Sequence, residues 1–154
     1  MSHRLQQDLK QSKPFASTAQ AVSVGLLRTS HLLRRYADQQ MEDLGLTLQQ
    51  YNVLRILKGA SAPLPTMEIG ERLVEPAPGI TRMMSRIEKS GWATHQPGDD
   101  RRQKLWVLTP QGYHVLEKGD QVTQCLDRLI SGVMSEDELS RFSSDLETLR
   151  SALL

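Results

Sequence analysis

The sequence predicts a mainly α-helical fold that contains one small β-hairpin. Apolar residues recur at helical spacing along most of the 154 residues. Paired capping residues mark the starts of several of these helices. A turn-rich segment, PGDDRRQ at 97–103, separates two short runs with strand character, which is typical of a hairpin.

Composition narrows the class of protein. Cys125 is the only cysteine, so an intrachain disulfide is excluded. No apolar run is long enough to cross a membrane, and the first residues lack the apolar stretch of a secretory leader. We therefore expect a soluble, cytoplasmic protein with no membrane partner. Its length suits one domain, or one domain with dimerisation arms.

Positive charge is concentrated in one short region. Residues 82–104 carry six Lys or Arg and three acids, a net of +3, whereas the remaining 13 basic and 15 acidic residues give −2. Such asymmetry indicates a polyanionic partner. A solvated charged face would give the same pattern, and this alternative stays open.

The first part of the chain predicts an arm and a long helix. Residues 1–16 are polar and contain Pro14, which favours a flexible arm. A helix is expected over 17–44, because Ser17 and Gln20 form a capping box and Gly45 fits the C′ position. Its apolar positions, starting at Val22, recur at an average spacing near 3.5, which suits a partner helix.

The middle of the chain predicts three shorter helices and the hairpin. Thr47 and Gln50 form a capping box, with Leu46 and Tyr51 as its hydrophobic staple. The helices are expected at 46–58, 65–74 and 77–90, with a break at Glu75-Pro76 and a stop at Gly91. The strands are expected at 92–96 and 104–108.

The last part of the chain predicts two helices. Thr109-Pro110 is an N-cap followed by proline, and it begins a helix to about residue 130. Ser135 and Glu138 form another capping box, and this last helix is expected to reach the end of the chain.

The helix at 77–90 has two distinct faces. Ile80, Met83, Met84 and Ile87 share one side, and the polar side carries hydroxyl, guanidinium and ammonium groups: Thr81, Arg82, Ser85, Arg86 and Lys89. These groups can bind phosphates or read base edges in a major groove. Because a helix, a sharp turn and the hairpin surround it, the order is that of a winged helix-turn-helix. Any exposed helix has a polar face, which is the simpler alternative.

The hairpin tip fits a role in the minor groove of DNA. Arginine enters that narrow, negative groove well, and Arg101 and Arg102 stand at the tip. Asp100 can pair with an arginine and fix its direction. A solvated turn with a weak ion pair is the alternative.

These segments resemble the MarR family of bacterial transcriptional regulators. TRMMSRIEKSGWATHQPGDDRRQKLWVLTPQG resembles the family's recognition helix, wing and next helix, with Asp100-x-Arg102 and Leu108-Thr109-x-x-Gly112 at the family spacing. LTLQQYNVLRIL and LPTMEIGERLVEPAPGITR resemble its preceding helices. The match covers about residues 20–154.

The resemblance implies a homodimer on pseudo-palindromic double-stranded DNA. By this likeness 17–45 and 110–154 are dimerisation helices, and 46–109 is the DNA-binding lobe. Arg102 matches the wing arginine and Asp100 the aspartate that orients it. Five residues match the family's helix positions near bases and phosphates: Pro78, Gly79, Thr81, Arg82 and Arg86. Thr66 is expected to donate to a phosphate, and phosphate contacts are also expected from Lys89, Arg101 and Lys104.

The resemblance also implies a small-molecule effector, often an aromatic or phenolic acid that releases the DNA. Four residues of the first long helix could line a crevice and meet a carboxylate: His31, Arg34, Arg35 and Tyr36. Dimer contacts and surface solvation are the alternative for these residues, and are favoured for at least two of them.

The remaining residues that could carry chemistry, chiefly histidines and the cysteine, do not indicate an enzyme. The sequence has no catalytic motif, and neither a metal nor a cofactor is expected, although His114 and Glu117 stand at i, i+3. Cys125 lies among apolar residues, so a buried structural role is preferred to a redox sensor. The sequence thus predicts a transcriptional repressor. The alternatives are a redox-responsive regulator through Cys125, or a ligand- or protein-binding module that has lost DNA binding.

Overall fold

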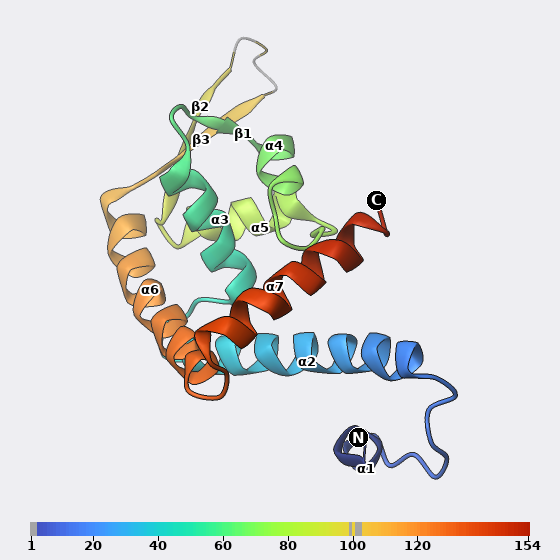
Figure 1. Cartoon of the computed structure of the whole chain (residues 1–154). Coiled ribbons are helices and arrows are strands. Elements are labelled where there is room, and N and C mark those ends of the chain that lie inside the picture. Colours follow the sequence, from blue (N-terminus) through green and yellow to red (C-terminus); the bar gives the residue numbers. More distant parts are fainter. Residues whose placement is uncertain (1–2, 99, 101–102) are drawn as a thin grey trace.

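The computed structural model describes residues 3–98, 100 and 103–154 (Figure 1). Its elements in chain order are α1 (His3–Asp8), α2 (Thr18–Met41), η1 (Glu42–Leu44), α3 (Leu48–Gly59), β1 (Leu64–Pro65), α4 (Thr66–Glu71), α5 (Ile80–Lys89), β2 (Ala93–Pro97), β3 (Lys104–Leu108), α6 (Pro110–Ser131) and α7 (Glu136–Ser151). The structure is mostly helical with a small antiparallel sheet, which confirms the predicted fold class.

The helix starts follow from their capping residues. Thr47 accepts a hydrogen bond from the backbone N–H of Gln50, whose side chain accepts one from the Thr47 N–H in return. Ser135 caps α7 in the same reciprocal way. At the other end of α2 and η1, Gly45 adopts a left-handed φ of 63°, as the predicted C′ position requires.

Some boundaries differ from the sequence predictions. A short helix, α1, lies within the segment expected to be an arm. α4 ends at Glu71 rather than at residue 74, and α5 begins at Ile80 rather than at 77. Gly79 has a φ of 89°, so the chain cannot be helical there, and Pro78 and Gly79 precede the recognition helix instead of belonging to it. α7 ends at Ser151, before the end of the chain.

The sheet has three strands in the order β1-β3-β2, all antiparallel. The hairpin pairs Ala93 with Leu108 at one end and Pro97 with Lys104 at the other. β1, which the sequence did not predict, pairs Leu64 with Trp106. Because β1 leads directly into α4, the sheet anchors the first helix of the helix-turn-helix to the wing.

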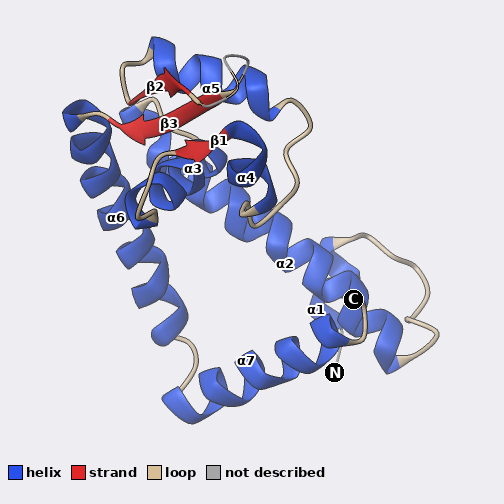
Figure 2. Ribbon diagram, turned by 90° about the horizontal axis from the view of Figure 1, so that it is seen from above, coloured by secondary structure: helices blue, strands red, loops and turns tan. Residues whose placement is uncertain are grey.

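One core joins the lobe to the adjoining ends of α2 and α6. The fully buried side chains include Met41 at the end of α2, Ile69 and Ile87 in the helix-turn-helix, and Leu116 in α6. No residue of α7 is buried, and Figure 2 shows this helix extending from the far end of α6, away from the sheet. None of the helices in the described part of the chain is long and apolar enough to span a bilayer.

Candidate nucleic-acid interface

α5 presents its polar side outward while its apolar side is buried. Met84 and Ile87 lie in the core, and Ile80 and Met83 pack against it. Thr81, Arg82, Arg86 and Lys89 are exposed, and we call these four residues the recognition face. Four hydrogen-bond donors, three of them cationic, thus point away from the lobe along one helix.

Ser85 departs from the expectation for this helix. Its hydroxyl is half-buried and donates to the Thr81 carbonyl oxygen over 3.0 Å. A hydroxyl whose proton is used within the helix can only accept a hydrogen bond from an outside partner. Ser85 therefore has less to offer a phosphate than the four exposed residues.

The C-terminal end of α5 is tied to the wing by a contact that the sequence did not reveal. His95 on β2 places its Nδ1 atom 2.7 Å from Glu88 Oε1 on α5. The His95 ring also lies against Trp106 on β3, with centroids 4.8 Å apart. These residues lie within the segment that resembles the family's recognition helix and wing, but no spacing in the sequence pairs them, so only the folded chain identifies them as a link between the two.

Thr66 stands at the first position of α4, where the sequence placed it. Trp106 Nε1 donates to Thr66 Oγ1 over 2.8 Å, and Lys104 lies 5.5 Å from the Trp106 ring centroid. Because the threonine oxygen accepts from the indole, its own proton remains to be donated elsewhere. This geometry suits the predicted contact of Thr66 with a phosphate.

The wing tip is only partly described. The Asp100 carbonyl oxygen accepts from the Gln103 N–H over 2.8 Å, and the Gln103 carbonyl oxygen accepts from the Gly98 N–H over 2.9 Å. Arg101 and Arg102 lie outside the described residues, so the predicted pair of Asp100 with Arg102 remains a prediction.

Most of the predicted DNA-binding residues that the structure describes line one of two hollows beside α5. A broad one of about 860 Å³ lies between α4, α5 and the wing, and its lining includes Thr66, Thr81, Asp100 and Lys104. A second of about 350 Å³ adjoins the start of α3, and its lining includes Pro78, Gly79, Arg82 and Arg86. Ser85 and Lys89 line neither of these two hollows.

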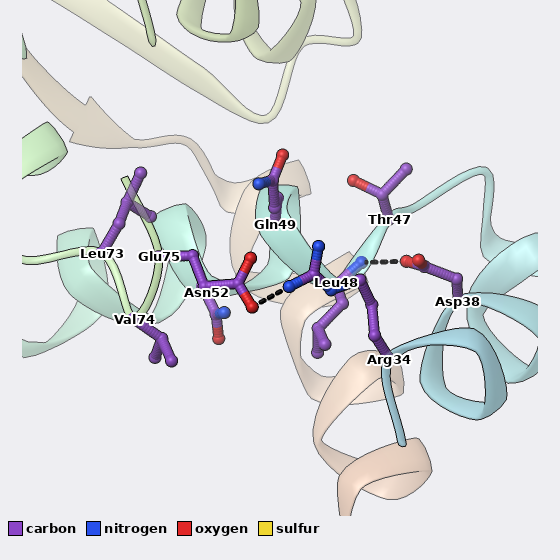
Figure 3. A pocket seen from close by; sticks show the side chains of 9 residues that line it. All are labelled: Arg34, Asp38, Thr47, Leu48, Gln49, Asn52, Leu73, Val74 and Glu75. Atoms are coloured by element: carbon purple, nitrogen blue, oxygen red, sulfur yellow. Dashed lines mark hydrogen bonds and ion pairs between the residues drawn. The ribbon is translucent and has the colours of Figure 1, made fainter. Parts of the chain in front are cut away.

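A separate pocket lies between α2, the start of α3 and the turn after α4 (Figure 3). Its volume is about 310 Å³, and we call it the crevice pocket. It is lined by Arg34, Asp38, Thr47, Leu48, Gln49, Asn52, Leu73, Val74 and Glu75. Of the four residues predicted to meet an effector, only Arg34 lines it; His31, Arg35 and Tyr36 do not.

Arg34 and Asp38 connect α2 to the lobe across this pocket. The Arg34 guanidinium forms an ion pair with Glu75 in the turn before α5. Asp38 Oδ1 accepts a hydrogen bond of 2.7 Å from the backbone N–H of Leu48, at the start of α3. Both contacts are drawn in Figure 3.

A polar cluster joins α3 to α6 on another side of the lobe. Asp120 Oδ1 accepts from the Tyr51 hydroxyl over 2.8 Å, and Thr123 Oγ1 lies 3.2 Å from the same hydroxyl. Arg55 and Lys58 approach the two Asp120 oxygens at 3.3 and 3.5 Å. Burial, more than any neighbouring group, raises the pKa of Tyr51 above its ordinary value. We call these five residues the α3–α6 joint.

Cys125 is exposed in the chain, which corrects the expectation that it is a buried residue. Arg128 donates to its Sγ atom over 3.0 Å. Val122 still packs against the core, whereas Leu129, one turn after Cys125, is 46% exposed within this chain. Within residues 3–98, 100 and 103–154, no three His, Cys, Asp or Glu side chains gather as a metal site would need.

Comparison with known proteins places this geometry among bacterial regulators. No protein-family model matches the chain. The uncharacterized HTH-type transcriptional regulator YwoH of Bacillus subtilis (strain 168) is 36% identical over 84 residues, which are 54% of this chain and 61% of that protein. The chain therefore spans less than two thirds of this relative's length.

Two solved structures extend the likeness over most of the chain. Sco5413, a MarR family transcriptional regulator from Streptomyces coelicolor, is 26% identical with a TM-score of 0.75, covering 88% of this chain and 94% of that one. MepR of S. aureus, solved as a DNA complex, is 21% identical with a TM-score of 0.77, covering 84% and 96%. The resemblance predicted from the sequence is confirmed: the chain is similar to HTH-type transcriptional regulators and has the winged helix fold of the MarR family.

Proposed function

We propose that this protein is a transcriptional regulator, and specifically a repressor, that binds pseudo-palindromic double-stranded DNA as a homodimer. The recognition face carries the proposal: Thr81, Arg82, Arg86 and Lys89 project from a helix whose other side is fixed in the core. A rigid helix with cationic donors fits a major groove.

The wing supplies the second part of the interface. Arg102, oriented by Asp100, enters the minor groove, and Arg101 and Lys104 bind the flanking phosphates. Thr66 donates its remaining proton to a phosphate, supported by its hydrogen bond from Trp106. Pro78 and Gly79 bring the start of α5 close to the backbone of the DNA.

The dimer is proposed from the uncovered apolar side chains of the long helices. On α2, Val22 and Leu27 are exposed, and on α7 Phe142 and Leu149 are exposed. Apolar residues that stay exposed along a helix in its own chain favour cover by a partner. A second copy gives the two-fold symmetry that a pseudo-palindrome requires, with the two recognition helices about 34 Å apart.

Repression and release follow from this arrangement. A dimer bound over a promoter excludes the polymerase, and an effector that alters the spacing of the two lobes releases it. The crevice pocket lies where such an effector would act, between a dimerisation helix and the lobe.

Fluorescence anisotropy on duplex DNA from immediately upstream of the gene tests the proposal, with unrelated duplex as competitor and salt varied. Tight, competitor-resistant binding is expected. The logarithmic salt slope should fall by about 0.9 for each phosphate that Arg82→Ala or Arg86→Ala can no longer neutralise. Lys118→Ala, an exposed cation on α6 outside the lobe, is the matched control and should leave the slope unchanged.

Binding no better than to unrelated duplex, both here and in a selection from randomised duplexes, would refute DNA recognition. It would favour the module that keeps the fold without binding DNA.

The exposure of Cys125 favours one second candidate, a redox-responsive regulator. Mass-shift labelling of the thiol after mild peroxide, combined with anisotropy, separates this mode from a ligand switch. Cys125→Ser should abolish the response if the redox mode operates.

A further inference from the structure

The crevice pocket carries more negative than positive charge. Among the side chains that line it, Asp38 and Glu75 are acidic and only Arg34 is basic, so the formal net charge is −1. The sequence-based expectation was the reverse, because it grouped Arg34 with Arg35 and His31. The structure leaves Arg35 and His31 out of the lining and brings two carboxylates in.

The single cation of the pocket is already engaged. Arg34 is paired with Glu75, and both side chains are partly exposed at 41% and 42%. Glu75 is bound through one guanidinium nitrogen, so an anionic ligand that used the other N–H groups of Arg34 would share the pocket with the carboxylates of Glu75 and Asp38. Like charges repel, so this binding is unfavourable.

A cationic ligand meets no such conflict. Asp38 uses Oδ1 to accept from the Leu48 N–H, and within the described part of the chain its Oδ2 atom has no hydrogen-bond partner. Glu75 pairs with Arg34 through Oε1. The second oxygens of both carboxylates can therefore accept from an ammonium or amidinium group without breaking either contact.

The rest of the pocket fits an organic ion better than a metal ion. Leu48, Leu73 and Val74 give it apolar walls, and Val74 is 83% exposed, which leaves apolar surface for a ligand to cover. Two carboxylates provide fewer ligands than a bound divalent cation takes from oxygen donors. Thr47, Gln49 and Asn52 add neutral polar groups.

We propose that the crevice pocket binds an organic cation, an apolar body with an ammonium or amidinium group, and that Asp38 and Glu75 recognise its charge. The pocket joins α2 to the turn before α5, so a bound cation changes how the lobe sits on the dimerisation helices. This consequence for DNA rests on the proposed function, whereas binding of the cation does not.

Three probes of one shape and different charge test the inference on the full-length chain without DNA. They are 1-naphthylmethylamine (cationic), 1-naphthoate (anionic) and 1-naphthylmethanol (neutral), each titrated by calorimetry at neutral pH. The amine is expected to bind at least about tenfold more tightly than the naphthoate, a difference of about 1.4 kcal/mol. Equal or tighter binding of the naphthoate or the alcohol, or no binding of any probe, would overturn the inference.

Two conservative variants locate the charge recognition. Asp38→Asn retains an oxygen for the Leu48 N–H, and Glu75→Gln retains the side-chain length; each should weaken the amine about tenfold and bring it close to the alcohol. Asp43→Asn, an exposed carboxylate in η1 outside the pocket, should leave amine binding unchanged. If the two pocket variants bind the amine like the natural chain, the pocket is not its site. If either variant fails to fold, the ranking of the three probes on the natural chain still decides.

Anisotropy on operator DNA separates this inference from the proposed function. A chain that binds the amine but no DNA would refute the regulator and retain the cation site. A chain that binds DNA but no amine would do the opposite.

Discussion

Replacing Asp120 tests how the winged helix lobe is fastened to α6. Its carboxylate accepts from the buried Tyr51 hydroxyl and approaches two exposed cations of α3, Arg55 and Lys58. Asp120→Ala removes all three contacts. Asp120→Asn keeps an oxygen for Tyr51 and removes only the charge.

The magnitudes follow from burial. A hydrogen bond from the buried Tyr51 hydroxyl to a carboxylate stabilises by about 1.5–3 kcal/mol, with part of the loss offset by the nearby Thr123 hydroxyl. The two ion pairs have partners that are 55% and 42% exposed, so solvent screening limits each to about 0.2–0.5 kcal/mol. Asp120→Ala should therefore lower the free energy of unfolding by about 2–3 kcal/mol, and Asp120→Asn by about 1 kcal/mol.

Urea denaturation measures these differences at one fixed protein concentration, because the midpoint of the proposed dimer depends on concentration. In high salt the deficit of Asp120→Asn should shrink, since the ion pairs that it removes are exposed, whereas that of Asp120→Ala should persist. Asp127→Asn, an exposed acid on the same helix, should stay within about 0.5 kcal/mol of the natural chain. Equal losses for the alanine and asparagine variants would refute the assigned role of the Tyr51 hydrogen bond.

Three further predictions concern other parts of the lobe. Gly112→Ala should lower the free energy of unfolding by about 3 kcal/mol, because an added Cβ would lie 1.9 Å from the Trp92 carbonyl oxygen. Gly59→Ala, where a Cβ meets nothing within 4 Å, is its control in urea denaturation; similar losses in both would contradict the packing explanation. His95→Ala should weaken operator DNA binding about tenfold, measured by anisotropy, because it frees Glu88 and loosens α5 from the wing. Unchanged affinity would show that DNA binding does not need this link. Burial raises the pKa of Tyr51, so the stability that its neutral form provides is complete below its unfolded pKa of about 10 and is lost as pH rises towards the folded value. Thermal melting of the natural chain should fall more steeply above that pH than melting of Tyr51→Phe, and parallel curves would count against the assignment.

The elements fixed by local chemistry were predictable from the sequence. The caps at Thr47, Thr109 and Ser135, the left-handed Gly45 and the register of apolar residues in α5 all act within a few residues, and the structure has each of them. β1 was missed because a two-residue strand has no periodicity of its own. It exists only because Trp106, some forty residues later, pairs with Leu64.

The site was harder to predict where it depends on which side of a helix faces the lobe. Arg34 and Arg35 are neighbours in sequence but point about 100° apart on a helix. Asp38, four residues after Arg34, shares its side, and both line the crevice pocket. Local charge in the sequence therefore predicted a basic site, whereas the helix period produces a pocket with net negative charge.

α6 determines how a change at the crevice pocket would reach the DNA. Its first residues are fastened to the end of the recognition helix, because its N-cap, Thr109, donates to the Gly91 carbonyl oxygen over 2.6 Å. Leu116 of α6 lies in the core. One helical turn later, Asp120 connects α6 to α3 through its hydrogen bond with Tyr51. Because α6 is attached to the lobe at two places, the lobe and α6 should move together as one body. The crevice pocket joins the same lobe to α2 through Arg34 and Glu75, so a ligand there acts on the contacts between the lobe and α2. On the proposed function, a cation in this pocket would move the lobe and α6 together relative to α2 rather than reshape the recognition face. Loosening the joint with Asp120→Ala should then reduce the effect of the ligand on DNA binding more than it reduces DNA binding itself.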